Sequence, residues 1–271
     1  MPELPEVETI MRALAARLTG RRVTGLVQRR ADIRAPLPEE LEARVRGRTF
    51  LRFARRAKFI ECFLDGGNVL LLHLGMSGRL VFDGEACGPH EHLTFAFDDG
   101  TTLRFVDPRR FGMVDLWPTD RLGEHPSLRH LGLEPLQPGF DGRRLVATLA
   151  GRRAALKVAL MDQRLVVGVG NIYASESLFR ARLHPARPAG GLTPREAQRL
   201  ARAIRQVLRE AIEAGGSSLR DYVQSNGELG NFQHSFQVYD RAGEPCLRCG
   251  SVVERMVQGA RTTYCCRMCQ R

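Results

Sequence analysis

Two pairs of cysteines near the C-terminus constrain the fold of this chain more than any other feature. Residues 246–249 and 266–269 each read Cys-x-x-Cys, and sixteen residues separate them. Each pair lets two thiolates converge on one ion, and the intervening segment fits a β-hairpin. Four sulfur ligands favour a closed tetrahedral site, so we expect Cys246, Cys249, Cys266 and Cys269 to hold one structural zinc ion. Cys265 is excluded because only Cys266 gives a two-residue gap to Cys269.

The charge of the chain predicts a polyanionic partner. The 271 residues carry a formal net charge of +11 and the sequence pI is about 10.0. Nearly all of the positive charge is arginine, whose planar guanidinium suits phosphate groups. We therefore expect binding to nucleic acid that weakens as salt rises. The alternative is a compositional bias of thermophilic or high-GC organisms with no such partner.

Several classes of protein are disfavoured by the sequence. The first residues are acidic and do not form the apolar core of a signal peptide. No apolar run approaches the length that spans a bilayer. Four of the seven cysteines lie in the paired motifs, which favours a metal in a reducing compartment over a disulfide framework. We expect a cytoplasmic protein with no membrane partner.

The first half of the chain reads as one helix followed by short β-strands. Residues 5–18 carry an apolar stripe at helical spacing, with Pro5 at a position that helices tolerate. Turn sequences at 65–68 and 98–100 predict hairpins. Eight short strands with such turns indicate an antiparallel sandwich or barrel. The expected strands are 23–30, 49–55, 59–64, 69–74, 79–82, 93–97, 102–106 and 113–117.

The second half is predicted to be helical up to the cysteine motifs, which makes the chain an α+β multidomain protein. Thr193-Pro194-Arg195-Glu196 is a capping box that starts a long helix, and Gly215-Gly216 ends it. Gln237 is expected to begin the zinc hairpin. The predicted division is a β-domain at 1–133, a linker at 134–150, a helical domain at 151–236 that includes a Gly-rich loop at 215–231, and a zinc finger at 237–271.

Five further motifs, in order along the chain, carry a resemblance to a known family. They are Pro-Glu-Leu-Pro-Glu-Val-Glu-Thr at 2–9, Arg-Ala-Lys-Phe at 56–59, His-Leu-Gly-Met-Ser-Gly at 73–78, Asp-Pro-Arg-Arg-Phe-Gly at 107–112 and Gly-Val-Gly-Asn-Ile-Tyr-Ala at 168–174. With the four cysteines they resemble formamidopyrimidine-DNA glycosylases, bacterial enzymes that remove oxidised purines. The resemblance covers essentially the whole chain and implies a monomeric bacterial protein. It implies a leading helix, a two-layer β-sandwich, a helix–two-turn–helix domain and a zinc finger, with duplex DNA held between the domains.

The resemblance implies catalysis by the amino terminus. Removal of Met1 would leave Pro2 as a secondary amine, and α-amino groups have a pKa near 8. Such an amine can attack the sugar, expel the damaged base and form a Schiff base that permits strand cleavage by β,δ-elimination. Glu3 is implied as the general acid/base and Glu6 as a supporting acid. The alternative for both carboxylates is a purely structural role at the start of the helix.

The resemblance also implies how DNA is held. Lys58 and Arg261 complete the implied catalytic group by contacting phosphates at the lesion, and His73, Asn171 and Tyr239 contact the backbone. Met76, Arg109 and Phe111 would fill the space left by the flipped base, and Arg110 belongs to the same loop. Residues 217–222 resemble the lesion-recognition loop. Most of these residues also have a purely structural alternative. Lys58 would be an exposed strand-edge lysine, Arg261 an exposed hairpin-tip arginine and His73 a core histidine. Asn171 would be a helix cap, Tyr239 a packing tyrosine, and Met76 and Phe111 apolar core residues.

Three functions remain open from the sequence. The first is a bifunctional glycosylase and abasic-site lyase for oxidised purines, acting on double-stranded DNA that contains an oxidised purine or an abasic site. The second is an endonuclease VIII-like glycosylase for oxidised pyrimidines, which is disfavoured by the purine-type set of Met76, Arg109 and Phe111. The third is a zinc-ribbon DNA-binding protein without enzymatic activity.

Overall fold

The chain forms two compact units in the computed structural model, which describes residues 1–84, 88–218 and 230–271. One unit comprises Met1–Arg129 with Gly215–Asn231, and the other comprises His130–Ala214 with Phe232–Arg271. The first is built on antiparallel sheets and the second on helices and a hairpin, so the predicted α+β class is confirmed. Residues 215–231, expected with the helical domain, cluster with the β-unit. The finer four-part division remains a prediction.

The first unit begins with helix α1 (Leu4–Leu18), one residue earlier than the pattern predicted. Glu3 caps it, and the side chain of Glu6 accepts a hydrogen bond from the Glu3 backbone N–H at 2.8 Å. One face of the helix is buried in the core of the unit through Val7, Ile10 and Leu14. Because this face packs from the first turn onward, the residues just before the helix are held in a fixed position.

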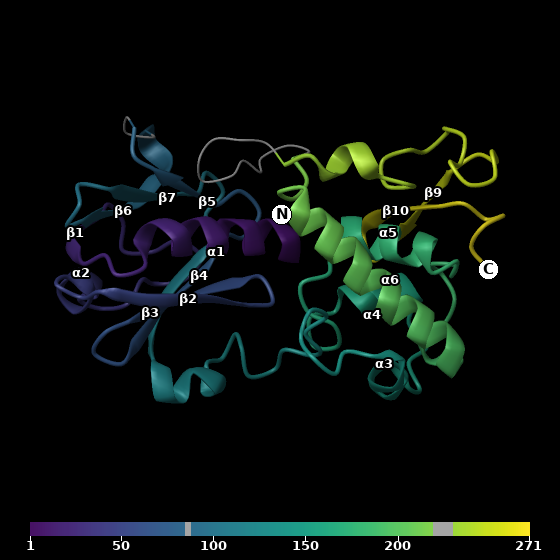
Figure 1. Ribbon diagram of the computed structural model, residues 1–271, viewed down its shortest axis with the longest axis horizontal. Helices are drawn as coiled ribbons and strands as arrows, with labels where there is room; N and C mark the ends of the chain where they lie inside the picture. The colour runs from purple at the N-terminus through teal and green to yellow at the C-terminus, as the bar shows by residue number, and fades with distance from the viewer. Residues whose placement is uncertain (85–87, 219–229) are drawn as a thin grey trace. The chain divides into compact units, whose positions relative to one another are not determined.

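Two four-stranded antiparallel sheets form the sandwich, as expected (Figure 1). The eight predicted strands are all present, with ends that differ from the prediction by at most two residues. One sheet has the order β1 (Val23–Gln28), β6 (Glu91–Phe97), β7 (Thr102–Val106) and β5 (Arg79–Phe82). The other has the order β2 (Phe50–Arg56), β3 (Phe59–Leu64), β4 (Asn68–His73) and β8 (Met113–Pro118). Short helices lie between β1 and β2 (α2, Leu41–Val45) and between β5 and β6 (η1, Gly88–His90), and a third follows β8 (η2, Thr119–Glu124).

The core of the first unit lies between the sheets and under α1. It contains Phe50, Ile60, Phe95 and Phe105, each at most 2% exposed, together with the buried face of the helix. Cys62 lies in the same core, and burial raises the pKa of its thiol far above the usual range. The thiol is therefore an inert apolar group.

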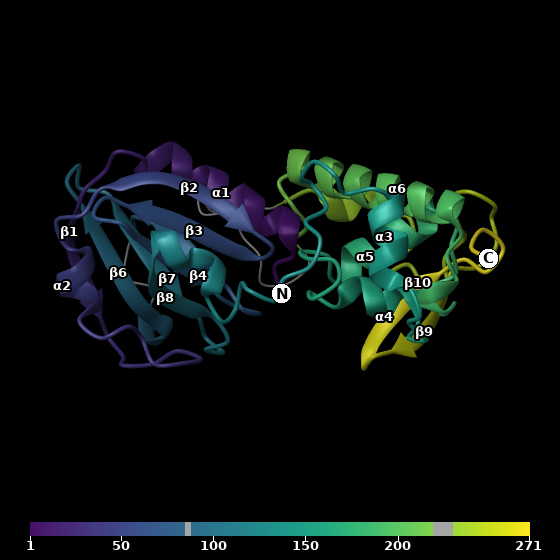
Figure 2. The same ribbon diagram turned by 90° about the horizontal axis from the view of Figure 1, so that it is seen from below.

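The second unit is a group of helices that includes the long helix α6 (Figures 1 and 2). Its helices are α3 (Gly142–Leu149), α4 (Leu156–Met161), α5 (Asn171–Arg180), η3 (Ala189–Gly191), α6 (Pro194–Glu213) and η4 (Phe232–Ser235). The predicted capping box of α6 is present: Thr193 Oγ1 accepts from the Glu196 backbone N–H, and the Glu196 carboxylate accepts from the Thr193 N–H. No helix in the described ranges has both the length and the apolar character needed to cross a bilayer.

A two-stranded hairpin, β9 (Glu254–Gln258) and β10 (Arg261–Cys265), completes the second unit. The expectation that Gln237 begins this hairpin is wrong. The backbone N–H groups of Gln237, Val238 and Tyr239 instead donate to the carboxylate of Glu176 on α5. These donors are thus engaged by a buried side chain, which leaves them unavailable to a β-ladder.

Candidate active site and DNA contacts

The amino terminus is packed against its own helix. Pro2 is buried and Glu3 is 4% exposed, whereas Met1 is 49% exposed. Glu3 occupies the N-cap position in an extended conformation, directly ahead of the positive end of the α1 dipole. Pro2 and Glu3 therefore sit side by side at the start of the helix, and residue 1 lies on the solvent side of them.

Glu6 has a structural role that the sequence offered as one of two alternatives. It is 2% exposed, and each of its oxygens accepts a backbone hydrogen bond. Oε2 accepts from the Glu3 N–H and Oε1 from the Ser217 N–H, both at 2.8 Å. This carboxylate thus fixes the start of α1 and fastens it to the segment that follows α6.

The segment from 215 to 231 is closed at its base. Ser217 forms an isolated antiparallel bridge with Asn231, and the Gly230 N–H donates to Ser218 Oγ at 2.8 Å. A side chain at Gly230 would lie 2.3 Å from the carbonyl oxygen of Gly216, so only glycine permits this approach. The part of the predicted lesion-recognition loop at 219–222 lies outside the described residues.

Lys58 and His73 lie at the same end of the β2-β3-β4 sheet. Lys58 is in the two-residue turn between β2 and β3, and the neighbouring Phe59 pairs with His73 across β3 and β4. Lys58 is 5% exposed, so it is not the solvated strand-edge lysine of the alternative reading. Arg55 fixes this turn to α1, because its guanidinium donates to Glu8 Oε2 at 2.8 Å and to the Ala57 carbonyl at 2.9 Å.

His73 is held as a neutral donor. Burial, and then the positive charges of Lys58 and Arg34, lower the pKa of His73 to about 4. Its Nδ1 accepts a hydrogen bond from the Gly75 N–H at 3.0 Å, which assigns the proton of the neutral ring to Nε2. Nε2–H can therefore donate to an acceptor such as a phosphate oxygen without a change of protonation.

Two loops of the first unit present the candidate void-filling residues. Met76 lies in the β4–β5 loop and is half-buried, whereas Arg109, Arg110 and Phe111 lie in the β7–β8 loop and are exposed. Phe111 is 42% exposed, which excludes the alternative of a core residue for it. The Arg109 guanidinium lies 4.8 Å from the centre of the Phe111 ring, a cation–π distance. An exposed aromatic ring and guanidinium stacked on a tight turn are suited to enter a base stack.

In the second unit, Asn171 and Tyr239 meet next to the hairpin. Asn171 is the first residue of α5, and its Nδ2 donates to the Thr262 carbonyl at 3.0 Å and lies 3.4 Å from the Tyr239 hydroxyl. Gly170, not Asn171, occupies the N-cap position, so the capping alternative for Asn171 does not hold. The helix start offers backbone N–H groups that suit an anion.

Arg261 is the first residue of β10, directly after the turn Gly259-Ala260. Its partner across the hairpin is Gln258, and its side chain is exposed. Thr262, which follows it, carries the carbonyl that accepts from Asn171. The hairpin tip and the start of α5 are therefore joined within one unit, and three predicted DNA contacts, Asn171, Tyr239 and Arg261, gather around that junction.

Two buried charged residues of this region were missed by the sequence reasoning. Lys157 on α4 is 1% exposed and donates to Asn171 Oδ1 at 2.5 Å, to the Thr262 carbonyl and to Thr263 Oγ1. Glu176 is fully buried and holds residues 237–239. A signal for Lys157 existed, because the chain has only two lysines, at 58 and 157, among 41 basic residues. Both are buried, and the ammonium group of lysine is more compact than a guanidinium.

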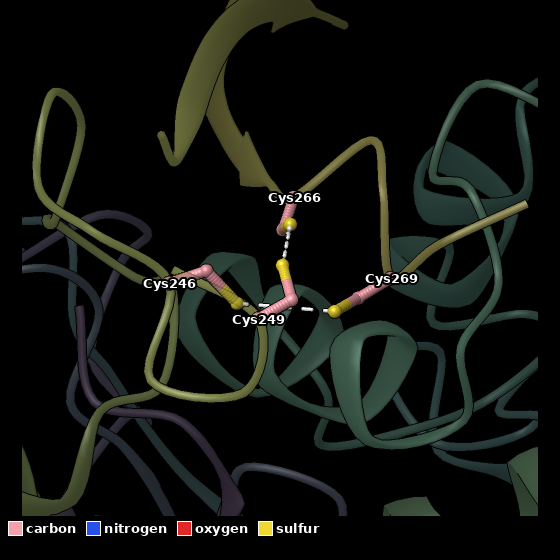
Figure 3. Close-up of side chains that lie close together, drawn as sticks. All are labelled: Cys246, Cys249, Cys266 and Cys269. Carbon is pink, nitrogen blue, oxygen red and sulfur yellow. Dashed lines mark hydrogen bonds between the residues drawn. The ribbon is translucent and has the colours of Figure 1, made fainter. Parts of the chain in front are cut away.

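The four cysteines converge as predicted (Figure 3). Their sulfur atoms all lie within 4.8 Å of one another, with Cys246 and Cys269 at 3.9 Å and Cys249 and Cys266 at 3.5 Å. Zinc–sulfur bonds of about 2.3 Å in a tetrahedron require sulfur separations of about 3.8 Å, so the residues fit the ion. The Arg248 N–H donates to Cys246 Sγ, as expected of a thiolate ligand. Cys265 is buried outside the group.

Together, the fold and these sites define a basic zinc protein with a β-sandwich unit and a helical, hairpin-bearing unit. Residues 1–114 match the formamidopyrimidine-DNA glycosylase N-terminal domain, residues 131–223 the H2TH domain of the same family, and residues 243–271 the zinc finger found in FPG and IleRS. The chain is 49% identical to the formamidopyrimidine-DNA glycosylases of Cereibacter sphaeroides and Azorhizobium caulinodans, with 100% of both chains covered in each case.

Comparison with solved structures points to the same family. The MutM (Fpg) protein of Thermus thermophilus superposes with a TM-score of 0.89 at 44% identity, covering 99% of this chain and 98% of that one. The Lactococcus lactis Fpg bound to abasic-site DNA gives 0.90 at 32% identity, covering 99% of each chain. The chain belongs to the formamidopyrimidine-DNA glycosylase family. Its four cysteines hold one structural zinc ion, which the match to the family's zinc finger and the converging sulfur atoms support.

Proposed function

We propose that this protein is a bifunctional base-excision repair enzyme, which removes oxidised purines from duplex DNA and then cleaves the strand. The observation that carries the proposal is the burial of Pro2 and Glu3 at the start of α1, in a chain of the glycosylase family. Relatives have been captured with the expected ligands: the Lactococcus lactis Fpg is described in complexes with abasic-site DNA and with Fapy-dG DNA.

Pro2 supplies the nucleophile once Met1 is removed. A terminal amine with a pKa near 8 is unprotonated in roughly a tenth of molecules at pH 7, far more than a lysine side chain. Its lone pair bonds to C1′ of the damaged nucleotide while the C1′–N bond to the base breaks and the base leaves with a proton. Opening of the sugar ring gives an iminium between Pro2 and C1′. The iminium acidifies C2′–H, so loss of that proton expels the 3′ phosphate, and a second elimination expels the 5′ phosphate.

Glu3 is the proposed acid/base, because its carboxyl group belongs to the residue that follows the nucleophile. It would protonate O4′ as the sugar ring opens and move protons in the eliminations. Glu6 acts differently. Both of its oxygens are engaged by backbone N–H groups, so its contribution is to hold the terminus in place.

The phosphate contacts are distributed over both units. In the first unit, Lys58 and the neutral Nε2–H of His73 lie at one end of a sheet. In the second, Asn171, Tyr239 and Arg261 surround the junction of α5 with the hairpin tip. Donors on rigid elements fix the register of the duplex without reading its sequence. Base flipping then leaves a gap that Met76, Arg109 and Phe111 would fill, with Arg110 beside them.

A second substrate class has one observation in its favour. The Lactococcus lactis Fpg is described in a complex with DNA that contains an oxidised pyrimidine. Oxidised pyrimidines are therefore a candidate minor substrate. The full-length match to formamidopyrimidine-DNA glycosylases favours oxidised purines as the main one.

We propose that the protein works in the bacterial cytoplasm, on the chromosome. Its relatives are bacterial, and its strong positive charge suits binding to DNA.

Excision rates on matched duplexes test the proposed function. The lesions are 8-oxoguanine opposite cytosine, a formamidopyrimidine opposite cytosine, and thymine glycol opposite adenine. We expect both purine lesions to be released faster than thymine glycol, with the strand cleaved at both phosphates. Faster release of thymine glycol would assign the protein to the pyrimidine class. DNA binding without cleavage of any of the three duplexes would leave a zinc-containing DNA-binding protein.

A further inference from the structure

We propose that Ser77 and Asp107 are positioning residues that lock the β4–β5 and β7–β8 loops into one rigid wedge before DNA is bound. The inference rests on the proposed function, in which Met76, Arg109 and Phe111 enter the space left by a flipped base. Ser77 and Asp107 touch no substrate in this account. Their role is to fix where those three side chains can reach.

The lock is a buried carboxylate shared by the two loops. Asp107 is 0% exposed, and its Oδ1 accepts from Ser77 Oγ at 2.6 Å while its Oδ2 accepts from the Gly112 N–H at 2.7 Å. Ser77 Oγ in turn lies 3.2 Å from the Arg109 N–H, which donates to it. One hydroxyl group therefore connects the loop of Met76 both to Asp107 and to the backbone of Arg109.

The backbone of Asp107 is itself held. Its carbonyl oxygen accepts from His92 Nε2 at 2.8 Å, and its N–H donates to the His90 carbonyl at 2.9 Å. His92 is 2% exposed and belongs to β6 of the sandwich. The carboxylate thus projects from a point fixed by the sheet, so the loops are positioned relative to the rigid part of the unit.

The backbones of the two loops also approach so closely that there is no room for a side chain at Gly75. A side chain at Gly75 would lie 2.3 Å from the Phe111 carbonyl carbon and 2.6 Å from the Gly112 nitrogen. The two backbones are therefore in contact at Phe111 and Gly112. Arg110, between the two wedge residues of its loop, has a φ of 55°, a conformation that non-glycine residues seldom adopt unless their surroundings impose it.

A purely structural role for this arrangement is disfavoured by its cost. A carboxylate with no exposed surface is expensive to bury, and apolar side chains would join two loops more cheaply. Hydrogen bonds do what apolar contacts cannot, because they fix direction as well as distance. The backbone groups they fix, the N–H of Arg109 and the N–H of Gly112, lie on either side of Phe111. The side chains of Arg109 and Phe111 are exposed and contribute little to the core. The polar lock therefore acts on the geometry of the exposed wedge.

Enzyme assays on Ser77→Ala test the functional part of the proposal. We expect excision of 8-oxoguanine opposite cytosine to fall by on the order of ten- to hundredfold, the range for misplaced positioning groups. The preference of the enzyme for cytosine over adenine opposite the lesion should fall too, because Arg109, whose guanidinium can hydrogen-bond the edge of the orphaned cytosine, is no longer held. Cleavage of a preformed abasic site should change little, since that step needs Pro2. Ser77→Thr, which keeps the hydroxyl, should restore the preference, and Ser127→Ala is the matched control.

Amide hydrogen exchange tests the lock itself, independently of any activity. In the wild-type protein the N–H groups of Arg109 and Gly112 should be protected, and Ser77→Ala should accelerate exchange of Arg109 while Asp107→Asn accelerates exchange of both. Unchanged protection, or an unchanged opposite-base preference in Ser77→Ala, would overturn the proposal. If the wild-type protein excised nothing, the proposed function would fail, and the exchange measurement would still decide whether the lock exists.

Discussion

The carboxylate of Glu6 accepts a hydrogen bond from the backbone N–H of Ser217, 211 positions later in the sequence, at 2.8 Å. The same side chain accepts from the N–H of Glu3. One buried group therefore holds the residue that follows the candidate nucleophile and the base of the segment that carries the predicted lesion-recognition loop. Displacement of either backbone segment would leave a buried oxygen of Glu6 unsatisfied, so the positions of Glu3 and Ser217 depend on each other.

Replacement of Glu6 by Gln should destabilise the protein by about 1–3 kcal/mol, since the amide can satisfy only one of the two N–H donors. Urea unfolding measures this change, and Glu39→Gln, an exposed carboxylate of the same unit, is the control. A variant with wild-type stability but no base release would contradict the structural role and favour direct proton transfer by Glu6.

Lys157→Met should weaken DNA binding about tenfold, because Asn171 and the Thr262 carbonyl lose a shared donor. Lys157→Arg should not restore affinity, since the larger guanidinium does not fit a position that is 1% exposed. Fluorescence anisotropy with an abasic-site analogue gives both values. Arg195→Met removes an exposed charge of the same unit, and an equal loss of affinity there would mean that only net charge matters.

Cys249→Ser should lose the zinc ion and most DNA affinity, because the energy of metal binding at a structural site is folding energy. Metal content by mass spectrometry and binding by anisotropy should fall together. Cys265→Ala, which alters the buried cysteine beside the ligand set, should retain one zinc per chain. Zinc retained in Cys249→Ser but lost in Cys265→Ala would mean that the ligand register is wrong.

The neutral state of His73 makes stability depend on pH. Because the folded protein lowers the pKa of His73 from 6.5 to about 4, the unfolded chain binds a proton in this interval that the folded protein does not. The contribution of His73 is therefore fully present above pH 6.5 and is lost as pH falls toward 4, by at most about 3 kcal/mol before solvent screening. The unfolding free energy of His73→Gln should fall less over this interval. Parallel curves for the two proteins would contradict the assignment.

Much of the fold could be predicted because local patterns and tertiary packing agree. The stripe of Val7, Ile10 and Leu14 predicted α1, and the turns at 65–68 and 98–100 predicted the hairpins that join β3 to β4 and β6 to β7. The five-residue helix α2 was missed, since so short a segment has no helical period to detect. The start of the zinc hairpin was misplaced because the pattern of 237–239 does not reveal that Glu176 engages its N–H groups.

The residues of the site could be predicted from the sequence better than the hydrogen bonds that connect them. The zinc ligands follow from spacing alone, whereas the candidate catalytic and DNA-binding residues came from a resemblance. Neither source indicated that Lys157 orients Asn171 or that Asp107 joins two loops, because both contacts connect residues far apart in the chain. A buried polar network has no periodicity, so it becomes visible only when the three-dimensional neighbours are known.

Borohydride trapping tests the central claim most directly. Protein with Met1 removed is mixed with duplex DNA that contains 8-oxoguanine opposite cytosine, reduced, digested and analysed by mass spectrometry. The account predicts one covalent adduct, located at Pro2 and absent from a Pro2→Gly variant that still binds the duplex. An adduct located at Lys58 or Lys157, or no adduct with either this lesion or an abasic site, would contradict it.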